Sequence, residues 1–274
     1  MTTPVIVRSP NGREVVFSGS EKFPIIAGPC VVESRDILVQ VAERLKQLEA
    51  NYPVSFIFKA SYRKANRTSS TSFTGIGDEA ALHLLGDIKR EFDMPVLTDV
   101  HLPNECAMAA RTCDILQIPA FLARQSELLA AAAETGKIVN IKKAQFMSPQ
   151  DMKYAREKVF AAGNSNVLLT ERGTSFGYGD LVVDFRSLEL MREFGSPIIY
   201  DATHSVQRPS QNGISGGERR FILPLARAAM AVGIDGLFVE THPDPAKAKS
   251  DAASQLPLGE LESFVKSLLS LRSV

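Results

Sequence analysis

Apolar and polar positions form two kinds of segment that alternate from residue 25 to the C-terminus. Short apolar runs rich in β-branched residues are followed by longer stretches with Ala, Leu and Lys at helical spacing. The alternation predicts a parallel sheet, and eight runs are the number that a closed (β/α)8 TIM barrel needs. The runs are IIAGPC (25–30), VSFIFKAS (54–61), PVLTDV (95–100), ILQIPA (115–120), IVNIKK (138–143), VLLTERG (167–173), PIIYDATH (197–204) and GLFVETH (236–242).

Helices are predicted between these runs and after the last one, at 36–49, 78–91, 104–111, 127–135, 149–161, 184–194, 219–232 and 258–271. A doubly wound open sheet is the competing architecture. Its dinucleotide-binding form needs Gly-x-Gly-x-x-Gly directly after the first strand, and that motif is absent there. The Gly-rich segments 75–80 and 173–180 fit neither this motif nor a phosphate-binding loop, so we predict that both are loops.

The N-terminal residues have a pattern of their own. VIVR and EVVF flank Ser9-Pro10-Asn11-Gly12, and Asn-Gly favours a tight hairpin turn. We predict that a hairpin within residues 1–24 closes the N-terminal face of the barrel. The length of 274 residues suits one barrel, so residues 1–274 are expected to form a single (β/α)8 domain.

Composition indicates the cellular compartment and the classes of partner to expect. Lys plus Arg equals Asp plus Glu, so no overall field favours nucleic acid or an anionic membrane. Three cysteines cannot all pair, which is typical of a reducing compartment, and no window suits a signal peptide or a membrane span. We expect a cytoplasmic protein that binds neither nucleic acid nor membranes. Cys106 and Cys113, seven residues apart, are predicted to share a buried helix face.

Each apolar run finishes with a charged, polar or otherwise special residue. In a parallel barrel the C-terminal ends of all strands meet at one rim, where such folds place their chemistry. A single polar strand end is commonly solvated, but eight together favour a pocket. These residues are Cys30, Lys59, Asp99, Gln117, Lys142, Arg172, His204 and Glu240.

Two chemical groups separate among the rim and loop residues. The cations Lys59, Lys64, Lys142 and Arg172, with Arg67 in the loop 64–70, would be costly to bury together without compensating anions. A multiply anionic ligand is therefore expected. Because Lys and Arg match phosphate and carboxylate oxygens, phosphorylated small molecules are the natural candidates.

The second group is Cys30, His204, Glu240 and Asp251. A thiolate, an imidazole and two carboxylates suit a divalent transition-metal ion, whereas Mg²⁺ and Ca²⁺ prefer oxygen alone. These residues lack the tight spacing of a structural zinc site. A lone Cys commonly packs as a small apolar residue, and a lone His commonly forms ordinary hydrogen bonds. From the residues alone, a metal site and a packing role both remain open.

At these positions the chain resembles the 3-deoxy-D-manno-octulosonate 8-phosphate synthase family, and the resemblance covers almost the whole barrel. It implies a transferase that condenses phosphoenolpyruvate with D-arabinose 5-phosphate and water, in an aldol-type step of lipopolysaccharide precursor biosynthesis. The matching segments are AGPCVVES (27–34), FKASYRKANRTSS (58–70), LTDVH (97–101), LQIPAFLARQ (116–125), NIKKAQF (140–146), ERGTSFGYGDLVVD (171–184), YDATHSVQ (200–207) and ETHPDPAKAKSDAASQLPL (240–258).

The resemblance also implies a metal. Members of the family that need no metal carry Asn at the position of Cys30, so the Cys implies the metal-dependent branch. Cys30, His204, Glu240 and Asp251 then match the four ligands. Fe²⁺, Zn²⁺, Mn²⁺ and Co²⁺ all suit this set, and the residue types do not choose between them.

Substrate contacts are implied in the same way. Lys64 would act as an acid toward the sugar aldehyde, and Asp251 or His204 would manage the proton of the attacking water. Arg124 and Ser215 match residues that family members lend to a neighbouring subunit, which implies a homotetramer. The loop 208–214 and Thr68, where the family usually has Ser, depart from the family pattern. The phosphoenolpyruvate set is Lys59, Ser61, Lys64, Asp99, Gln117, Pro119, Ala120, Lys142 and Arg172, and the arabinose 5-phosphate set is Asn66, Arg67, Thr68, Arg124 and Ser215.

Two alternative functions remain to be weighed against this one. The sister family, 3-deoxy-D-arabino-heptulosonate 7-phosphate synthase, shares the barrel and the metal set but uses erythrose 4-phosphate. Its sugar-phosphate loop typically reads Lys-Pro-Arg-Thr-Ser, so Lys-Ala-Asn-Arg-Thr-Ser-Ser at 64–70 favours the longer sugar. The other alternative is a catalytically silent protein that binds phosphorylated sugars. A full rim of catalytic residue types argues against it.

Overall fold

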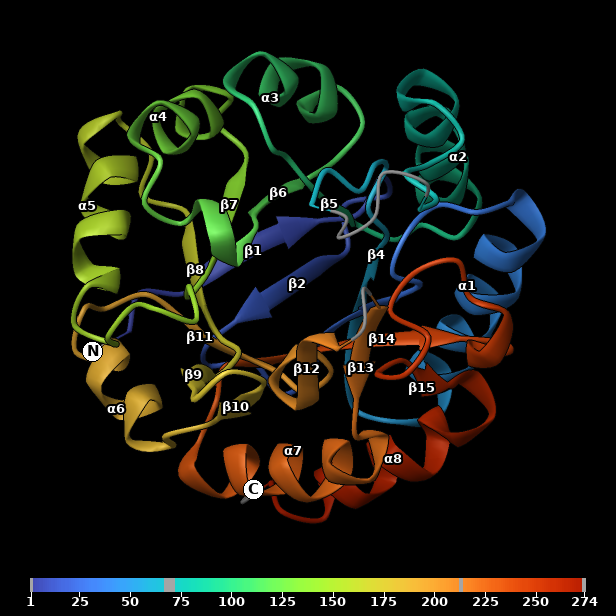
Figure 1. The fold of residues 1–274 in the computed structure, drawn as a ribbon. Coiled ribbons are helices and arrows are strands. Elements are labelled where there is room, and N and C mark those ends of the chain that lie inside the picture. The colour runs from blue at the N-terminus through green and yellow to red at the C-terminus, as the bar shows by residue number, and fades with distance from the viewer. Residues whose placement is uncertain (1, 67–71, 212–213, 273–274) are drawn as a thin grey trace.

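The computed structural model describes residues 2–66, 72–211 and 214–272. Eight parallel strands follow one another around a closed barrel in chain order (Figure 1). The last strand pairs with both its predecessor and the first strand, so the ring has no open edge. This confirms the predicted barrel and excludes the open sheet. The strands are β3 (Phe23–Gly28), β4 (Val54–Lys59), β5 (Val96–Asp99), β6 (Ile115–Ile118), β7 (Ile138–Lys142), β8 (Val167–Glu171), β11 (Ile198–Asp201) and β14 (Gly236–His242).

The helices surround the barrel and bury their apolar faces against it (Figure 1). In the first helix, Leu38, Val41, Leu45 and Leu48 lie on one face at helical spacing, and the Ser34 hydroxyl caps the N-terminus. The described residues form α1 (Arg35–Asn51), α2 (Asp78–Glu91), α3 (Pro103–Ala110), α4 (Ser126–Glu134), α5 (Met152–Ala161), α6 (Arg186–Arg192), α7 (Ile222–Val232) and α8 (Leu261–Leu269). Short 3₁₀ turns are η1 (Ala120–Leu122), η2 (His204–Val206), η3 (Arg219–Phe221), η4 (Pro245–Lys247) and η5 (Leu258–Glu260).

The N-terminal hairpin closes one end of the barrel, as predicted. Strands β1 (Val5–Arg8) and β2 (Glu14–Phe17) pair antiparallel and cross that opening (Figure 1). Its apolar side chains are buried in one cluster with one inward-facing residue from each barrel strand. The cluster comprises Val5, Val7, Val15 and Phe17 of the hairpin, and Ile26, Ile57, Leu97, Ile115, Ile138, Leu168, Ile199 and Phe238 of the barrel.

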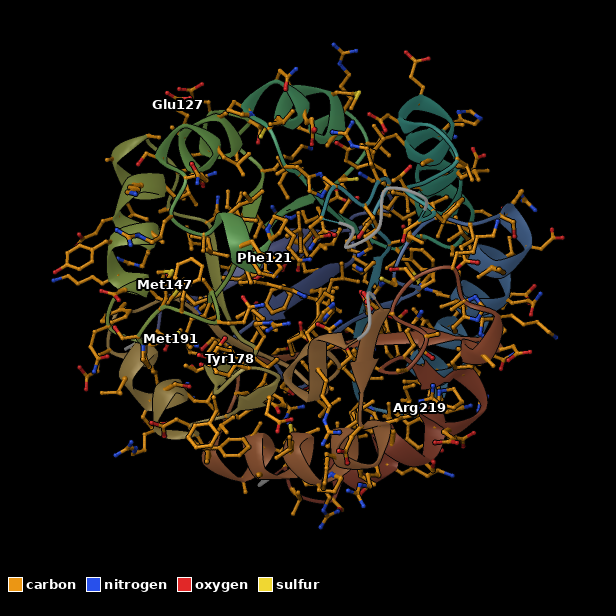
Figure 2. All side chains as sticks on the ribbon, in the orientation of Figure 1. Phe121, Glu127, Met147, Tyr178, Met191 and Arg219 are labelled. Carbon is orange, nitrogen blue, oxygen red and sulfur yellow. The ribbon has the colours of Figure 1, made fainter. Side chains whose placement is uncertain are left out.

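Side-chain direction alternates along each strand and stacks the interior in layers. In β7, Ile138 faces the barrel interior, whereas Val139 and Ile141 pack against the helices outside. Asn140 and Lys142 therefore follow Ile138 toward the C-terminal end of the barrel. The other strands repeat this order, and side chains fill the ring of strands (Figure 2). An apolar layer thus lies next to the hairpin, and polar layers lie above it.

Three sequence-based expectations are wrong in detail. The segment 75–80 is a loop only as far as Gly77, because α2 begins at Asp78. The segment 173–180 is not only a loop, because β9 (Thr174–Phe176) and β10 (Asp180–Val182) form a short hairpin there. Cys113 does not share a helix face with Cys106, because α3 ends at Ala110. Both thiols are nevertheless buried and free.

Further short strands follow the last two barrel strands on the same side. Strands β12 (Gln207–Gln211) and β13 (Ile214–Gly217) pair antiparallel after β11. Strand β15 (Leu256–Pro257) pairs with β14. The described part of the chain has no helix long and apolar enough to cross a membrane.

Candidate active site

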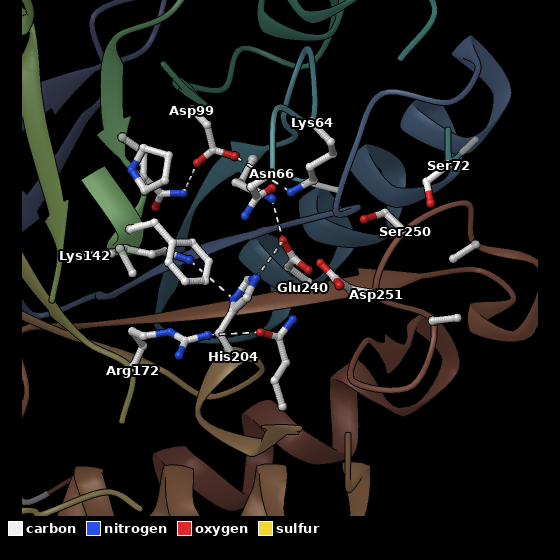
Figure 3. Close-up of a pocket in the computed structure, with 18 of the residues that line it drawn as sticks. Lys64, Asn66, Ser72, Asp99, Lys142, Arg172, His204, Glu240, Ser250 and Asp251 are labelled. Carbon is white, nitrogen blue, oxygen red and sulfur yellow. Dashed lines mark hydrogen bonds and ion pairs between the residues drawn. The ribbon is translucent and has the colours of Figure 1, made fainter. Parts of the chain in front are cut away.

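A cavity of about 480 Å³ opens at the C-terminal ends of the barrel strands (Figure 3). Strand ends and the loops that follow them line this cavity together, which brings residues far apart in the sequence into one site. Most of the sequence-predicted site residues lie here: Lys59, Lys64, Asn66, Asp99, Gln117, Pro119, Ala120, Lys142, Arg172, His204, Glu240 and Asp251.

The other predicted residues fall into three groups. Cys30 and Ser61 are fully buried behind the lining, where they contact Asp251 and Asp99. Arg124 is exposed just beyond η1, and Ser215 belongs to β13. Arg67 and Thr68 lie outside the described residues, as does part of the loop 208–214.

Three of the four predicted metal ligands form one cluster. The ligand atoms of Cys30, Glu240 and Asp251 all lie within 4.8 Å of one another, and Cys30 Sγ is 3.0 Å from Asp251 Oδ2. His204 stands beside this cluster, with its Nε2 3.7 Å from Glu240 Oε1. Figure 3 shows His204, Glu240 and Asp251 facing the same space.

The electrostatics of the cluster fit a bound cation. Glu240 Oε2 is buried and has no hydrogen-bond partner among the described residues, which is costly for a carboxylate oxygen. Burial raises the pKa of the Cys30 thiol well above its usual value, and the charges of Asp251 and Glu240 raise it further. A divalent cation would satisfy the carboxylate oxygen and stabilise the thiolate. The sulfur, nitrogen and oxygen donors suit a transition-metal ion.

Two lysines that line the cavity, Lys59 at the end of β4 and Lys64 in the segment after it, each face a carboxylate. Lys59 Nζ lies 2.5 Å from Glu240 Oε1, although strand β3 lies between the two strands that carry them. Gly28 of β3 is in register with Glu240, and a Cβ there would stand 1.9 Å from the Lys59 carbonyl oxygen. Only glycine therefore fits at this close approach. Lys64 Nζ lies 3.8 Å from Asp99 Oδ2.

Burial and charge act in opposite directions on these groups. Burial opposes the charge on Lys64, but the neighbouring Cys30 and Asp99 raise its pKa above the usual value. Burial also opposes ionisation of Glu240, yet Lys59 and His204 hold its pKa at about 2. The carboxylates are therefore ionised near neutral pH and offset most of the positive charge in the cavity.

Arg172 differs from the lysines. Its side chain is buried, and one guanidinium nitrogen, Nη2, donates to Gln207 Oε1 at 3.0 Å. The other nitrogen, Nη1, is buried with no partner in the described structure. A buried guanidinium with free donors is suited to hold an anion such as phosphate or carboxylate.

Asp201 is an important neighbour of the site that the strand-end pattern did not indicate. Its carboxylate accepts from Lys142 Nζ at 2.6 Å and lies 2.8 Å from His204 Nδ1. This contact turns His204 Nε2 toward Glu240. The sequence does carry a signal for Asp201, because it lies two positions after the inward-facing Ile199. The remaining residues that line the cavity are Ser72, Phe73, His101, Phe121, Gln145, Gln207, Ala248, Lys249, Ser250, Ala252 and Ala253.

Comparison with known proteins gives a consistent result. The sequence model of the DAHP synthetase I family matches residues 5–273. A 2-dehydro-3-deoxyphosphooctonate aldolase of Bartonella henselae is 50% identical over 256 residues, which are 93% of this chain and 92% of that protein. The aldolase of the same name from Rhizobium meliloti is 50% identical over 262 residues, 95% of this chain and 94% of that protein.

Proposed function

The chain belongs to the DAHP synthetase I family, and from its half-identical relatives we propose that it condenses phosphoenolpyruvate with D-arabinose 5-phosphate and water. The products are 3-deoxy-D-manno-octulosonate 8-phosphate, a precursor of lipopolysaccharide, and inorganic phosphate. Relatives that are half identical over more than nine-tenths of the chain carry the name of the corresponding aldolase. The observation that carries the proposal is that buried cations and a thiol-carboxylate cluster lie at the same cavity.

The cations of the cavity would bind phosphoenolpyruvate. Arg172 offers free donors to its phosphate or carboxylate, and Lys59 and Lys142 add positive charge nearby. Gln117, Pro119 and Ala120 form the wall against which the enol would lie, and Ser61 acts behind the wall by holding Asp99. Arabinose 5-phosphate would approach along Asn66, which lines the cavity. We assign its phosphate to Arg67 and Thr68, which lie outside the described residues.

The chain's own groups can move the protons that the reaction requires. C3 of phosphoenolpyruvate adds to the aldehyde carbon while water attacks C2, and the resulting hemiketal phosphate expels phosphate. Lys64, whose ammonium lines the cavity 3.8 Å from Asp99 Oδ2, would donate a proton to the aldehyde oxygen. Asp251 or His204 would take the proton of the attacking water.

A divalent ion is part of the proposal, with Cys30, His204, Glu240 and Asp251 as its ligands. Fe²⁺, Zn²⁺, Mn²⁺ and Co²⁺ all suit these donors. When bound, such an ion supplies Lewis-acid chemistry: it orients the aldehyde or lowers the pKa of a water. The unpartnered Glu240 Oε2 supports its presence.

The reaction is tested by phosphate release. Purified protein is incubated with phosphoenolpyruvate and either arabinose 5-phosphate or erythrose 4-phosphate, and inorganic phosphate is measured with time. We expect release with arabinose 5-phosphate at a kcat/KM at least tenfold higher than with erythrose 4-phosphate. Preference for erythrose 4-phosphate would favour the sister activity, and no release with either sugar would favour a silent binding protein.

The metal is tested by elemental analysis and chelation. Protein purified without oxygen should contain about one transition-metal ion per chain, and chelator should abolish activity until metal is restored. Cys30→Asn should change the chelator response, whereas Cys106→Ala, at another buried thiol, should leave it unchanged. If the wild-type protein is insensitive to chelator and Cys30→Asn behaves in the same way, the metal role is wrong.

The proposed enzyme works in the cytoplasm as a homotetramer. Several aromatic side chains support an interface on the loops after β6, β7 and β8. Phe121, Phe146 and Phe176 are 53%, 61% and 71% exposed, and Tyr178 is fully exposed. Such a concentration of exposed aromatic side chains favours a protein contact. Arg124 is exposed beside Phe121, where it could reach a neighbouring subunit.

A further inference from the structure

A chain of hydrogen bonds runs through the barrel interior beneath the cavity. Thr170 Oγ1 donates to Asn140 Oδ1 at 2.6 Å, and Asn140 Nδ2 donates to Gln117 Oε1 at 2.9 Å. Gln117 Nε2 then donates to Asp99 Oδ1, and the other carboxylate oxygen accepts from Ser61. These five side chains come from the consecutive strands β8, β7, β6 and β5 and the end of β4, and each is at least nine-tenths buried.

The ionised carboxylate fixes the direction of the whole chain. Asp99 only accepts hydrogen bonds, so the Gln117 amide must turn its nitrogen toward it. Gln117 Oε1 then faces Asn140, which must donate in turn, and Asn140 Oδ1 is left to accept from Thr170. If either amide turned over, two acceptors would face each other inside the protein, which is costly. Every hydrogen bond in the chain therefore points toward Asp99, and the Thr170 hydroxyl is the donor farthest from it.

Two of the five side chains reach the cavity. Gln117 and Asp99 line it, whereas Ser61, Asn140 and Thr170 are fully buried and do not. At the cavity, Asp99 Oδ2 faces the ammonium of Lys64 at 3.8 Å. Asn140 and Thr170 therefore help to hold the Gln117 amide and the Asp99 carboxylate from positions that no substrate can touch.

We propose that Thr170 and Asn140 are positioning residues for the reaction, which hold the Gln117 amide and the Asp99 carboxylate in their productive orientation at the phosphoenolpyruvate end of the cavity. The inference rests on the proposed function, because it needs a substrate that contacts Gln117 and Lys64. Thr170 acts through its hydroxyl, which keeps Asn140 Oδ1 turned away from Gln117. Without that donor, Asn140 Oδ1 is buried without its partner and the Asn140 amide is held from one side only, so its hydrogen bond to Gln117 Oε1 is held less firmly.

Thr170→Val tests this role, because valine has the shape of threonine without the hydroxyl. We expect kcat/KM for phosphoenolpyruvate to fall by about tenfold, the effect of losing one buried hydrogen bond. KM for arabinose 5-phosphate should stay within about twofold of wild type, since the sugar lies outside the chain of hydrogen bonds. Thr170→Ser restores the hydroxyl and should recover most of the lost kcat/KM. Ser196→Ala is the matched control, because it removes a buried hydroxyl that accepts from Arg156 at 2.8 Å far from the cavity.

Asn140→Ala provides a second test that does not depend on Thr170→Val alone. If Thr170 acts through Asn140, adding Thr170→Val to Asn140→Ala should cause no further loss of kcat/KM. Additive losses, or equal losses for both substrates without recovery in Thr170→Ser, would overturn the proposal. So would a folded Thr170→Val protein with wild-type kinetics. Absence of phosphate release by the wild-type protein would instead refute the proposed function, and with it this inference.

Discussion

Glu105 holds three neighbours in place beside the cavity. Its carboxylate accepts from Tyr62 Oη at 2.6 Å and from the His101 backbone at 2.8 Å, and it also pairs with Arg63. Burial opposes its charge, but the hydrogen bonds from His101 and Tyr62 hold its pKa at about 2. Because the folded protein lowers this pKa, Glu105 stabilises the fold above about pH 4.5, and the contribution is lost as pH falls toward 2.

Glu105→Gln replaces this carboxylate by an amide that does not titrate. At pH 6 the variant should be less stable than wild type, and the difference in unfolding free energy should shrink by about 2 kcal/mol by pH 3. Urea unfolding monitored by circular dichroism at several pH values measures it. Glu127→Gln, at an exposed position on α4, controls for the loss of one charge. A difference that stays constant with pH would contradict the assigned role of Glu105.

Individual residues were predictable where a strand ends, and less so one layer deeper. Lys142 and Arg172 stand out in the sequence as charges after an apolar run. Asn140 lies two positions before Lys142, and Thr170 lies two positions before Arg172, inside the same apolar runs. At such positions a polar residue only weakens the apolar pattern of a buried strand and does not indicate a site. The period-2 alternation places them on the inward face, but their partners belong to other strands. The hydrogen bonds between them follow from strand register, which one sequence does not reveal.

At the scale of elements, the N-terminal hairpin has a stabilising role at the end of the barrel opposite the cavity. Phe17 is fully buried against inward-facing residues of the barrel. Phe17→Ala should lower the free energy of unfolding by about 3–5 kcal/mol, because it leaves a void in this layer. Chemical denaturation measures the loss. Phosphate release below the unfolding transition should keep its wild-type kcat and KM.

Ile6→Ala is the control for this variant, since Ile6 lies in the same hairpin but is 40% exposed. It should cost far less stability than Phe17→Ala. Equal losses in the two variants would mean that the hairpin does not close the barrel through its buried face. A large change in KM for Phe17→Ala would instead mean that the two ends of the barrel are coupled.

Long periodic elements were predictable, and short ones at the rim were not. All eight barrel strands and their helices follow the expected order, and the helices expected from 219 and 258 begin three residues late because their first turns are 3₁₀. Strands β9 and β10 escaped prediction because they are three residues long. The side chains of β9 are all exposed, so no alternation of buried and exposed positions marks it.

At the scale of the whole molecule, closure of the barrel explains why separated residues form one site. Residues as far apart in the sequence as Lys59 and Ala253 line the same cavity, because the C-terminal ends of the barrel strands meet at the same rim. Net charge and composition led us to expect neither nucleic acid nor membrane partners, but they could not indicate which face would meet another subunit. That information depends on which apolar side chains remain outside the core after folding, and Figure 2 shows Phe121 and Tyr178 among them.

The proposed tetramer, which the family resemblance implies, can be measured directly from the mass of the assembly. Light scattering after gel filtration should give a mass four times that of the chain. Phe176→Asp combined with Tyr178→Asp should lower this mass, because charges would be buried at the contact, while circular dichroism stays unchanged. Activity should fall with the mass if Arg124 serves a neighbouring subunit. Val232→Asp, at an exposed apolar residue where α7 ends near the opposite face, should leave the assembly intact. A wild-type mass of one chain, with full activity, would show that the cavity is complete without a partner.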